Sequence, residues 1–407
     1  MEKNMNILIL TNIYPYEKDD NPDRTKIVAY FAREWVKQGH NVCVVINSAA
    51  FPGFYYGLGK YISKEILKHT RLVRLPDPIW TKEFEYNDFG VKVINLPMRK
   101  YVPQGTYSKK ILQEQYKKIE YWISQLDFYP DVITGHWLNP QLFLVAKFAA
   151  KYKAKTAFVF HSDFYKEKYK KFKVQRFIES VDHIGFRSRS ALNYAMNYMK
   201  LKNEPFVCSS GIPDEYLERF IYNEEKIFHN ESISVITAGR LVQYKHIDTI
   251  IDAAQSAFCD GKYRVNIAGD GPLKKELNAY IRDHNLDHNV VMYGQIDRDQ
   301  LQALMRSSDV FALISEREVF GLVYLEAMLH GCIVIASRFG AIDGIIIDGE
   351  NGFLCEEGNG EELKKILLQI KSMPNELKST ISNKAIATAR QYSESIVASN
   401  YLQEILK

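Results

Sequence analysis

The chain alternates short apolar runs, which are typical of buried β-strands, with stretches of helical periodicity. In the first half the strand-like runs are residues 6–10, 41–46, 91–96, 131–136, 156–161 and 183–188. In the second half they are residues 232–239, 263–271, 289–294, 309–315 and 331–337. Helical patterns lie between several of them, such as residues 25–38 and 108–125. Because alternating strands and helices build parallel, doubly wound sheets, the sequence predicts an α/β fold with two Rossmann-like domains in tandem.

A change of composition at residues 209–220 indicates the boundary between the two domains. A strand-like run there gives way to Gly211, Pro213 and acidic residues. A chain of 407 residues is long enough for two or three domains, each with its own core. We therefore predict domains at residues 1–210 and 211–392. No low-complexity linker separates them, so we expect them to face each other across a cleft.

The strongest chemical signal lies in the second domain, at residues 313–337. A strand-like run ends in a loop with charged residues, and a helix that begins near Gly321 leads to the next strand. In parallel sheets, ligands bind where the carboxyl ends of strands meet the amino ends of helices. Two glutamates, Glu318 and Glu326, frame this position.

The spacing of the two glutamates favours some kinds of chemistry over others. On one continuous helix, eight residues would separate their backbones by roughly 12 Å. The two carboxylates of a glycosidase are closer, at roughly 5 to 9.5 Å. The spacing therefore suits two distant hydroxylated parts of an extended ligand, with an anion between them at the helix start. Alternatively, both glutamates simply face solvent.

The segment EVFGLVYLEAMLHGCIVIAS, residues 318–337, resembles the donor-binding signature of the retaining glycosyltransferases of the GT-B fold, usually called family 4. The match includes both glutamates, the Phe-Gly pair and Glu-Ala-Met. The resemblance implies a GT-B fold, a nucleotide-diphosphate sugar as donor, linked to UDP or GDP, and neither a metal ion nor another cofactor. It also implies that the last helix, about residues 393–407, crosses back to the N-terminal domain.

The resemblance assigns roles around this loop. Glu326 would hold the ribose hydroxyls, and the backbone amides near Phe320, Gly321 and Leu322 would meet the diphosphate. Glu318 would bind sugar hydroxyls or stabilise positive charge at the anomeric carbon. Whether a carboxylate acts as a covalent nucleophile stays open.

Two further segments of the second domain fit the same ligand. Arg240 and Lys245 follow a strand, and cations at such a loop can hold a diphosphate and stabilise it as a leaving group. Their spacing alone is more typical of a surface pair, but the flanking residues resemble the phosphate-binding pair of the family. In the family, Gly269 and Gly271 shape the loop beside the nucleotide, and residues 292–297 hold its base.

In the first domain, two histidines end strand-like runs, His136 and His161. Both are expected at the carboxyl edge of the sheet, where ligands bind. The segment around His161 resembles the one that brings a histidine to the donor sugar in the family, so catalysis would require the domains to close. We regard His136 and Asp163 as weaker candidates.

Two segments depart from the family pattern. Many relatives have a glycine pair in the loop at residues 11–24, where this chain has Asp20, Asn21 and Pro22, which predict a turn. Where relatives often have Pro-Glu, this chain has Asp343 and Gly344, which leaves the sugar specificity open.

Charge is distributed unevenly between the two halves. Residues 1–210 contain 33 Lys and Arg against 20 Asp and Glu, whereas residues 211–407 contain 20 against 29. A basic half predicts an anionic partner. The run at residues 164–177 resembles a basic amphipathic helix, which would contact an anionic membrane or a lipid-diphosphate acceptor. A solvated helix face above a core stripe explains the run equally well. No nucleic-acid-binding signature is present, so no nucleic acid is expected.

The remaining composition indicates a cytoplasmic protein, peripheral on the inner face of the membrane if it contacts lipid. The five cysteines have no metal-type spacing and are expected to be reduced core thiols. The sequence has neither a signal-peptide pattern nor a long apolar segment. His284 and His288 have an i, i+4 spacing, but this region is more typical of a helix end than of a metal site.

The sequence therefore predicts a retaining glycosyltransferase that transfers a sugar to a hydroxyl acceptor, such as a lipid-linked or surface-polysaccharide precursor. Two alternatives stay open. One is a nucleotide-sugar epimerase or hydrolase of the same fold, and the other is a non-catalytic binding or scaffold subunit.

Overall fold

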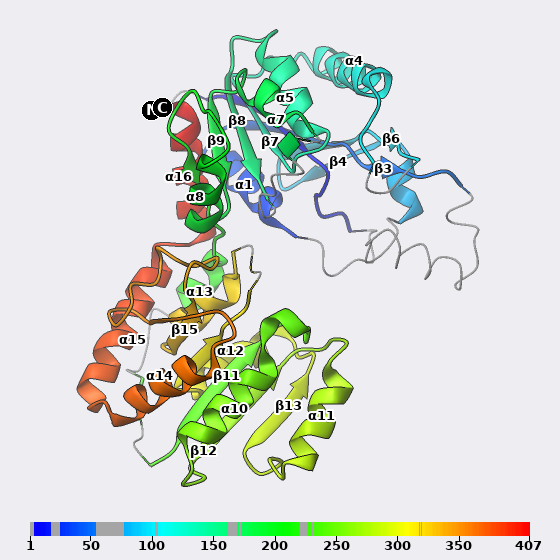
Figure 1. Ribbon diagram of the computed structural model, residues 1–407. Helices are drawn as coiled ribbons and strands as arrows, with labels where there is room; N and C mark the ends of the chain where they lie inside the picture. Colours follow the sequence, from blue (N-terminus) through cyan, green and yellow to red (C-terminus); the bar gives the residue numbers. More distant parts are fainter. Residues whose placement is uncertain are drawn as a thin grey trace. The chain divides into compact units, whose positions relative to one another are not determined.

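The computed structural model describes residues 4–17, 25–53, 77–101, 105–161, 169–170, 172–219, 226–228, 231–316, 318 and 320–407. By its internal contacts the chain forms two compact units (Figure 1). The first comprises residues 1–187, 191–208 and 398–407, and the second comprises residues 188–190 and 209–397.

The first unit is built on an eight-stranded sheet of order β10-β9-β8-β7-β1-β2-β5-β4. Its strands are β1 (Asn6–Thr11), β2 (Asn41–Ile46), β4 (Phe84–Asp88), β5 (Val91–Asn95), β7 (Val132–His136), β8 (Lys155–Phe160), β9 (His183–Phe186) and β10 (Phe206–Val207). A separate two-stranded sheet pairs β3 (Ala49–Ala50) with β6 (Met98–Arg99). The central strands are apolar throughout because helices cover both faces of a parallel sheet, and residues 7–10 of β1 are fully buried.

One edge of this sheet departs from the expected parallel arrangement. Strand β4 pairs antiparallel with β5 through a two-residue turn at Phe89 and Gly90, both of which have positive φ angles. Such turns match the twist of a β-hairpin. Strand β4 was not predicted from the sequence, because its side chains are mostly polar and none of them is fully buried.

The helices around the first sheet are α1 (Ile27–Lys37), η1 (Pro78–Thr81), α4 (Lys109–Gln125), α5 (Gln141–Ala149), α7 (Val174–Ile178), α8 (Arg189–Met196) and the end of α16 (Glu394–Leu406). Helix α16 packs on α1 through Tyr401, whose ring lies 5.4 Å from that of Trp35. Trp35 Nε1 donates a 2.9 Å hydrogen bond to the carbonyl of Ala398. The last helix therefore packs into the core of the first unit.

The second unit is built on a six-stranded parallel sheet of order β13-β12-β11-β14-β15-β16. Its strands are β11 (Ile233–Ala238), β12 (Tyr263–Ala268), β13 (Val290–Gly294), β14 (Val310–Leu313), β15 (Ile333–Ser337) and β16 (Phe353–Cys355). Its helices are α9 (Asp214–Arg219), η2 (Gln243–Lys245), α10 (Ile247–Ala257), α11 (Lys274–Asp283), α12 (Arg298–Ser307), α13 (Leu322–Leu329), α14 (Gly360–Ser372) and α15 (Asn375–Arg390).

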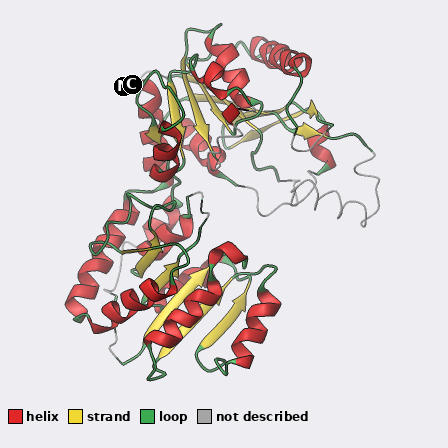
Figure 2. Ribbon diagram, in the orientation of Figure 1, coloured by secondary structure: helices red, strands yellow, loops and turns green. Residues whose placement is uncertain are grey.

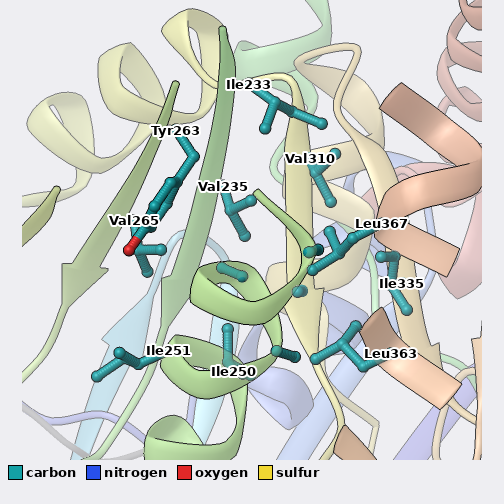
Figure 3. Close-up of a cluster of buried hydrophobic side chains, with 14 of the residues drawn as sticks. Ile233, Val235, Ile250, Ile251, Tyr263, Val265, Val310, Ile335, Leu363 and Leu367 are labelled. Carbon is teal, nitrogen blue, oxygen red and sulfur yellow. The ribbon is translucent and has the colours of Figure 1, made fainter. Parts of the chain in front are cut away.

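Helices cover both faces of this sheet (Figure 2). Val235 and Ile236 are neighbours on β11, yet they belong to separate buried clusters on opposite faces. Ile250 of α10 and Leu363 of α14 belong to the same cluster as Val235 (Figure 3). The predicted α/β fold of doubly wound parallel sheets is confirmed in both units.

Candidate functional site

The second unit contains a cavity of about 520 Å³ at the carboxyl edge of its sheet. Its wall is formed by the ends of β11 and β12, by the loop after β13 and by the start of α13. The lining residues are Ala238, Gly239, Arg240, Tyr244, Lys245, Ala268, Gly269, Gln295, Ile296, Leu301, Glu318, Gly321, Leu322, Val323 and Glu326. The position is the one at which parallel sheets bind ligands.

Lys245 and Glu318 form an ion pair in the wall of this cavity. Lys245 is the last residue of η2, and only 10% of its side chain is exposed. The amide of Glu316 donates a 3.0 Å hydrogen bond to the carbonyl of Tyr244, which ties the Glu318 loop to η2. Arg240 also lines the cavity, from a more exposed position. The structure therefore brings the two predicted cations together with Glu318.

Glu326 lies in the second turn of α13, and its carboxylate is engaged by Arg298 at the start of α12. Arg298 donates to Glu326 Oε1 from its terminal nitrogen at 2.5 Å and from Nε at 3.2 Å. The Glu326 side chain is 8% exposed. Burial lowers the pKa of Arg298, but the carboxylate outweighs this effect and the pKa is raised. Both bonds from Arg298 end on Oε1, so Oε2 stays available to accept hydrogen bonds from a ligand.

The role of Arg298 was not predicted from the sequence. The capping box of α12, in which Asp297 accepts from the amide of Gln300, could have predicted that a helix begins at Arg298. No sequence pattern pairs Arg298 with a glutamate 28 residues further along the chain.

We expect Arg298→Ala to weaken the binding of nucleotide diphosphates by about tenfold, because a buried carboxylate that loses its charged partner is no longer held in one rotamer. Calorimetric titration with UDP and GDP measures the change. In a double-mutant cycle, Arg298→Ala should add little once Glu326 is already Ala. Additive losses would show that Arg298 does not act through Glu326.

The start of α13 has the geometry of an anion-binding helix terminus. Gly321 precedes the helix with φ +70°, and a Cβ there would lie 2.5 Å from the ring of Tyr324. Leu322 lines the cavity, whereas Phe320 is buried in the core of the unit. The Phe320 side chain therefore anchors the loop from behind the cavity. Because Glu318 precedes the helix, the 12 Å separation predicted for one continuous helix does not apply.

The two predicted loop glycines allow two loops to pack backbone against backbone. A Cβ on Gly269 would lie 1.9 Å from the carbonyl oxygen of Gly239, and one on Gly271 would lie 2.4 Å from that of Leu241. Gly269 lines the cavity, but Gly271 is not among its lining residues. Gln295 and Ile296, from the segment predicted to hold a base, do line it.

In the first unit, His136 and His161 form a hydrogen-bonded pair at the carboxyl ends of β7 and β8. His136 Nδ1 lies 2.8 Å from His161 Nε2. The ring of His161 stacks on that of Trp137 with centroids 4.2 Å apart. His136 is fully buried, and its Nε2 lies 3.4 Å from the hydroxyl of Tyr401, which in turn hydrogen-bonds Thr134.

Both histidines of the pair are neutral at pH 7. Burial, with a smaller effect from the nearby Arg187, lowers the pKa of His136 to about 3. The pKa of His161 is lowered well below its usual value by burial, by His136 and by Arg187. His161 is therefore suited to hydrogen bonding rather than to carrying a positive charge.

These pKa shifts predict acid sensitivity of the first unit. Below the unfolded pKa of about 6.5 the unfolded state binds protons that the folded histidines do not, so stability falls as the pH drops. Between pH 6.5 and about 4.5 we expect His136, with its pKa of about 3, to lower the free energy of unfolding by about 1.4 kcal/mol per pH unit, and His161 to act in the same direction. Urea titrations of the wild type and of His136→Phe measure it. An unchanged slope in the variant would contradict the buried neutral state of His136.

Two other predictions need correction. Residues 164–168 and 171 of the basic run 164–177 lie outside the described residues. In its described part the run is not one continuous helix, because Lys173 has φ +50° and α7 begins only after it. Tyr169 and Phe172 pack against the core, as the core-stripe alternative predicted. Cys259 is exposed, so not every cysteine is a core thiol. Asp20, Asn21, Pro22 and Asp163 lie outside the described residues.

The remaining candidate residues, at His284 and at Asp343 and Gly344, have positions that the local backbone explains. His284 ends α11, where its Nδ1 lies 2.9 Å from the carbonyl of Tyr280. In the described part of the chain no three His, Cys, Asp or Glu residues are grouped to hold a metal ion. Gly344 has φ +85°, so the loop at Asp343 needs a glycine there. Within the same described ranges, no helix has the length and apolarity to cross a bilayer.

Comparison with solved structures defines the class of fold. Sucrose-phosphate synthase from Thermosynechococcus elongatus superposes with a TM-score of 0.67 at 15% identity, covering 98% of each chain. Its two Rossmann-like domains are those of the GT-B fold, so the chain has the GT-B fold.

Sequence comparison adds a family match within the second unit and partial matches to curated relatives. Residues 219–387 match the model of the family described as Glycosyl transferases group 1. A glycosyltransferase of Methanocaldococcus jannaschii, MJ1178, is 31% identical over 193 residues, 47% of this chain and 51% of the relative. The alpha-monoglucosyldiacylglycerol synthase of Acholeplasma laidlawii is 25% identical over 209 residues, 49% of this chain and 52% of the relative. The chain thus spans about half the length of these curated relatives, and the family model matches a stretch within its second unit.

Proposed function

We propose that the protein is a retaining glycosyltransferase that moves a sugar from a UDP- or GDP-linked donor to a hydroxyl of a lipid-linked or surface-polysaccharide precursor. One observation carries the proposal: a single cavity combines two cations, a helix start and two carboxylates. Lys245 and Arg240 suit the diphosphate, and the amides at Gly321 and Leu322 add partial positive charge. Glu326 suits the ribose and Glu318 the sugar.

The proposed reaction breaks the bond between the anomeric carbon and the β-phosphate oxygen. A bond to the acceptor oxygen forms on the same face of the sugar, and the proton of the acceptor leaves with the nucleotide diphosphate. Negative charge therefore grows on the diphosphate, where Lys245, Arg240 and the start of α13 stabilise it. These groups supply the positive charge, so we expect turnover to need no metal ion. His161, neutral, is proposed to donate or accept a hydrogen bond at a sugar hydroxyl.

The lipid-linked acceptor is the finer part of the proposal. Two observations support it: the basic composition of residues 1–210, and the similarity of about half of the chain to an enzyme named for the synthesis of a glycosylated diacylglycerol.

The test is donor turnover with UDP-glucose, UDP-N-acetylglucosamine and GDP-mannose, each with and without a membrane lipid extract and EDTA. We expect release of UDP or GDP that depends on the extract and is insensitive to EDTA. NMR of the product should show that the anomeric configuration of the donor is retained. Turnover without an acceptor would indicate a hydrolase or an epimerase. Donor binding without any turnover would indicate a non-catalytic subunit.

A further inference from the structure

The first unit contains a cavity of its own, of about 500 Å³. It lies between the segment that leads into α4, the start of α5, and α7. Sites for small molecules commonly have volumes of about 300 to 1,000 Å³, so the cavity can hold a ligand. It shares no lining residue with the cavity of the second unit.

The inner wall of this cavity is apolar. Leu138 and Leu142 line it together with three aromatic side chains, Phe143, Phe172 and Phe177. The rings of Phe143 and Phe177 meet edge to face at 5.6 Å. A wall of this kind favours a hydrocarbon segment, which loses its contact with water on binding.

Four cations line the same cavity: Lys109, Lys147, Lys173 and Arg176. No Asp or Glu is among the lining residues. In the described ranges no carboxylate forms an ion pair with any of these four side chains. Lys147 instead lies 6.0 Å from the ring centre of Phe143. The cavity thus has a positive potential that nothing described in the protein neutralises, and this favours an anionic ligand.

Lys173 occupies a conformation that costs energy. Its backbone has φ +50° and ψ +43°, immediately before α7, a region that residues other than glycine rarely adopt. Strained positions of this kind are found disproportionately at binding sites. A glycine would relieve the strain, so removing this cation should not destabilise the fold.

We propose that this cavity binds an amphiphilic phosphate ester, with the phosphate among the four cations and the hydrocarbon chain against the aromatic wall. Inorganic phosphate would leave the apolar wall uncovered, and an uncharged lipid would leave four cations without a partner. The ligand therefore carries both parts. If the amphiphile is the acceptor, that identity rests on the proposed function, whereas its binding does not.

The probe is decyl phosphate below its micellar concentration, with binding measured by calorimetric titration. We expect saturable binding to the wild type, and at least tenfold weaker binding to the double variant Lys173→Gly/Arg176→Gln. Decanol and inorganic phosphate should each bind at least tenfold more weakly than decyl phosphate. The matched control is Lys153→Gln/Lys155→Gln, two exposed lysines outside the cavity lining, with the same change of charge. The control should bind like the wild type.

Equal losses in the two double variants would show non-specific attraction and overturn the proposal, as would equal binding of inorganic phosphate. Absence of decyl phosphate binding would also overturn it. Vesicles of phosphatidylcholine with and without phosphatidylglycerol test whether the affinity comes from an anionic membrane surface and not from the cavity. Association with anionic vesicles that both double variants lose equally would indicate a membrane surface, not a site. If decyl phosphate does not bind but donor turnover is intact, this inference fails and the proposed function does not. If decyl phosphate binds but donor turnover is absent, the proposed function fails and this inference does not.

Discussion

Replacing Lys245 with alanine is expected to lower the kcat for the nucleotide sugar by about 10²- to 10³-fold, which is the usual effect of removing one group that stabilises transition-state charge. Lys245 lines the cavity with only 10% of its side chain exposed, so water cannot readily substitute for its charge. The loss should be larger in kcat than in KM, because the charge on the leaving diphosphate grows only as the bond breaks. Steady-state kinetics with the preferred donor measures both.

The matched control is Lys274→Ala. Lys274 forms a 2.5 Å ion pair with Asp270 four residues away, but the pair is largely exposed and outside the cavity lining. Exposed pairs of this kind contribute little, so turnover should stay unchanged. Lys245→Arg keeps the charge and should restore part of the loss. Full turnover by Lys245→Ala would remove the basis for assigning it to the leaving group.

Glu318, the ion-pair partner of Lys245, allows a second variant to test how the charge of Lys245 acts. In the alanine variant, the carboxylate of Glu318 loses its cation and adds negative charge where the diphosphate would lie. Lys245→Ala combined with Glu318→Gln removes both charges. If the repulsion matters, the double variant should bind the donor better than Lys245→Ala alone, although its turnover should stay low.

The parts of the fold that the sequence predicted are those with a local signal. The central strands are apolar on both faces, and β2 has the predicted bounds. Strand β4 could not be found this way, because FEYND lies at a sheet edge, has mostly polar side chains and buries none of them fully. The basic run at residues 164–177 was wrongly predicted as one helix, because Lys173 adopts a left-handed backbone conformation. Nothing in the sequence predicts that conformation for a lysine.

The residues of the candidate site were likewise predictable only where a local sequence pattern carries them. Glu318, Gly321 and Glu326 could be predicted because one loop and one helix carry them. The contacts that hold the site residues were not predictable, because they join distant parts of the chain. Arg298 and Glu326 meet through the packing of α12 and α13, and Tyr401 reaches His136 from 265 residues away. Such pairs depend on tertiary packing, which spacing along the chain does not encode.

The histidine pair yields the second prediction. His136→Phe is expected to lower kcat/KM by about tenfold, because the ring volume is kept while the hydrogen-bonding partner of His161 Nε2 is lost. A polar group that loses its partner in a buried setting costs about 1 to 3 kcal/mol, which corresponds to a change in rate of about 5-fold to 160-fold. Steady-state kinetics at saturating acceptor measures the change.

The control separates hydrogen bonding from packing. The ring of Phe31 lies 6.1 Å from that of His136 and 5.0 Å from that of Tyr401 without bonding either. Phe31→Leu should therefore lower the melting temperature and leave kcat/KM nearly unchanged. Tyr401→Phe removes one hydroxyl from the end of the chain and should reduce kcat/KM less than His136→Phe does. Equal losses of kcat/KM in Phe31→Leu and His136→Phe would show that the pair acts only through packing.

The pH profile then distinguishes the role of His161. Because its pKa is lowered well below the usual value, it stays neutral from pH 6 to 8 and cannot titrate there. The hydrogen bond between His136 Nδ1 and His161 Nε2 fixes which nitrogen of the neutral His161 ring carries the proton, and hence whether Nδ1 of His161 donates to a ligand or accepts from it. His161→Ala should therefore lower kcat/KM by the same factor at pH 6, 7 and 8. A loss that grows or disappears across this range would mean that His161 carries a proton in the reaction, as a general acid or base.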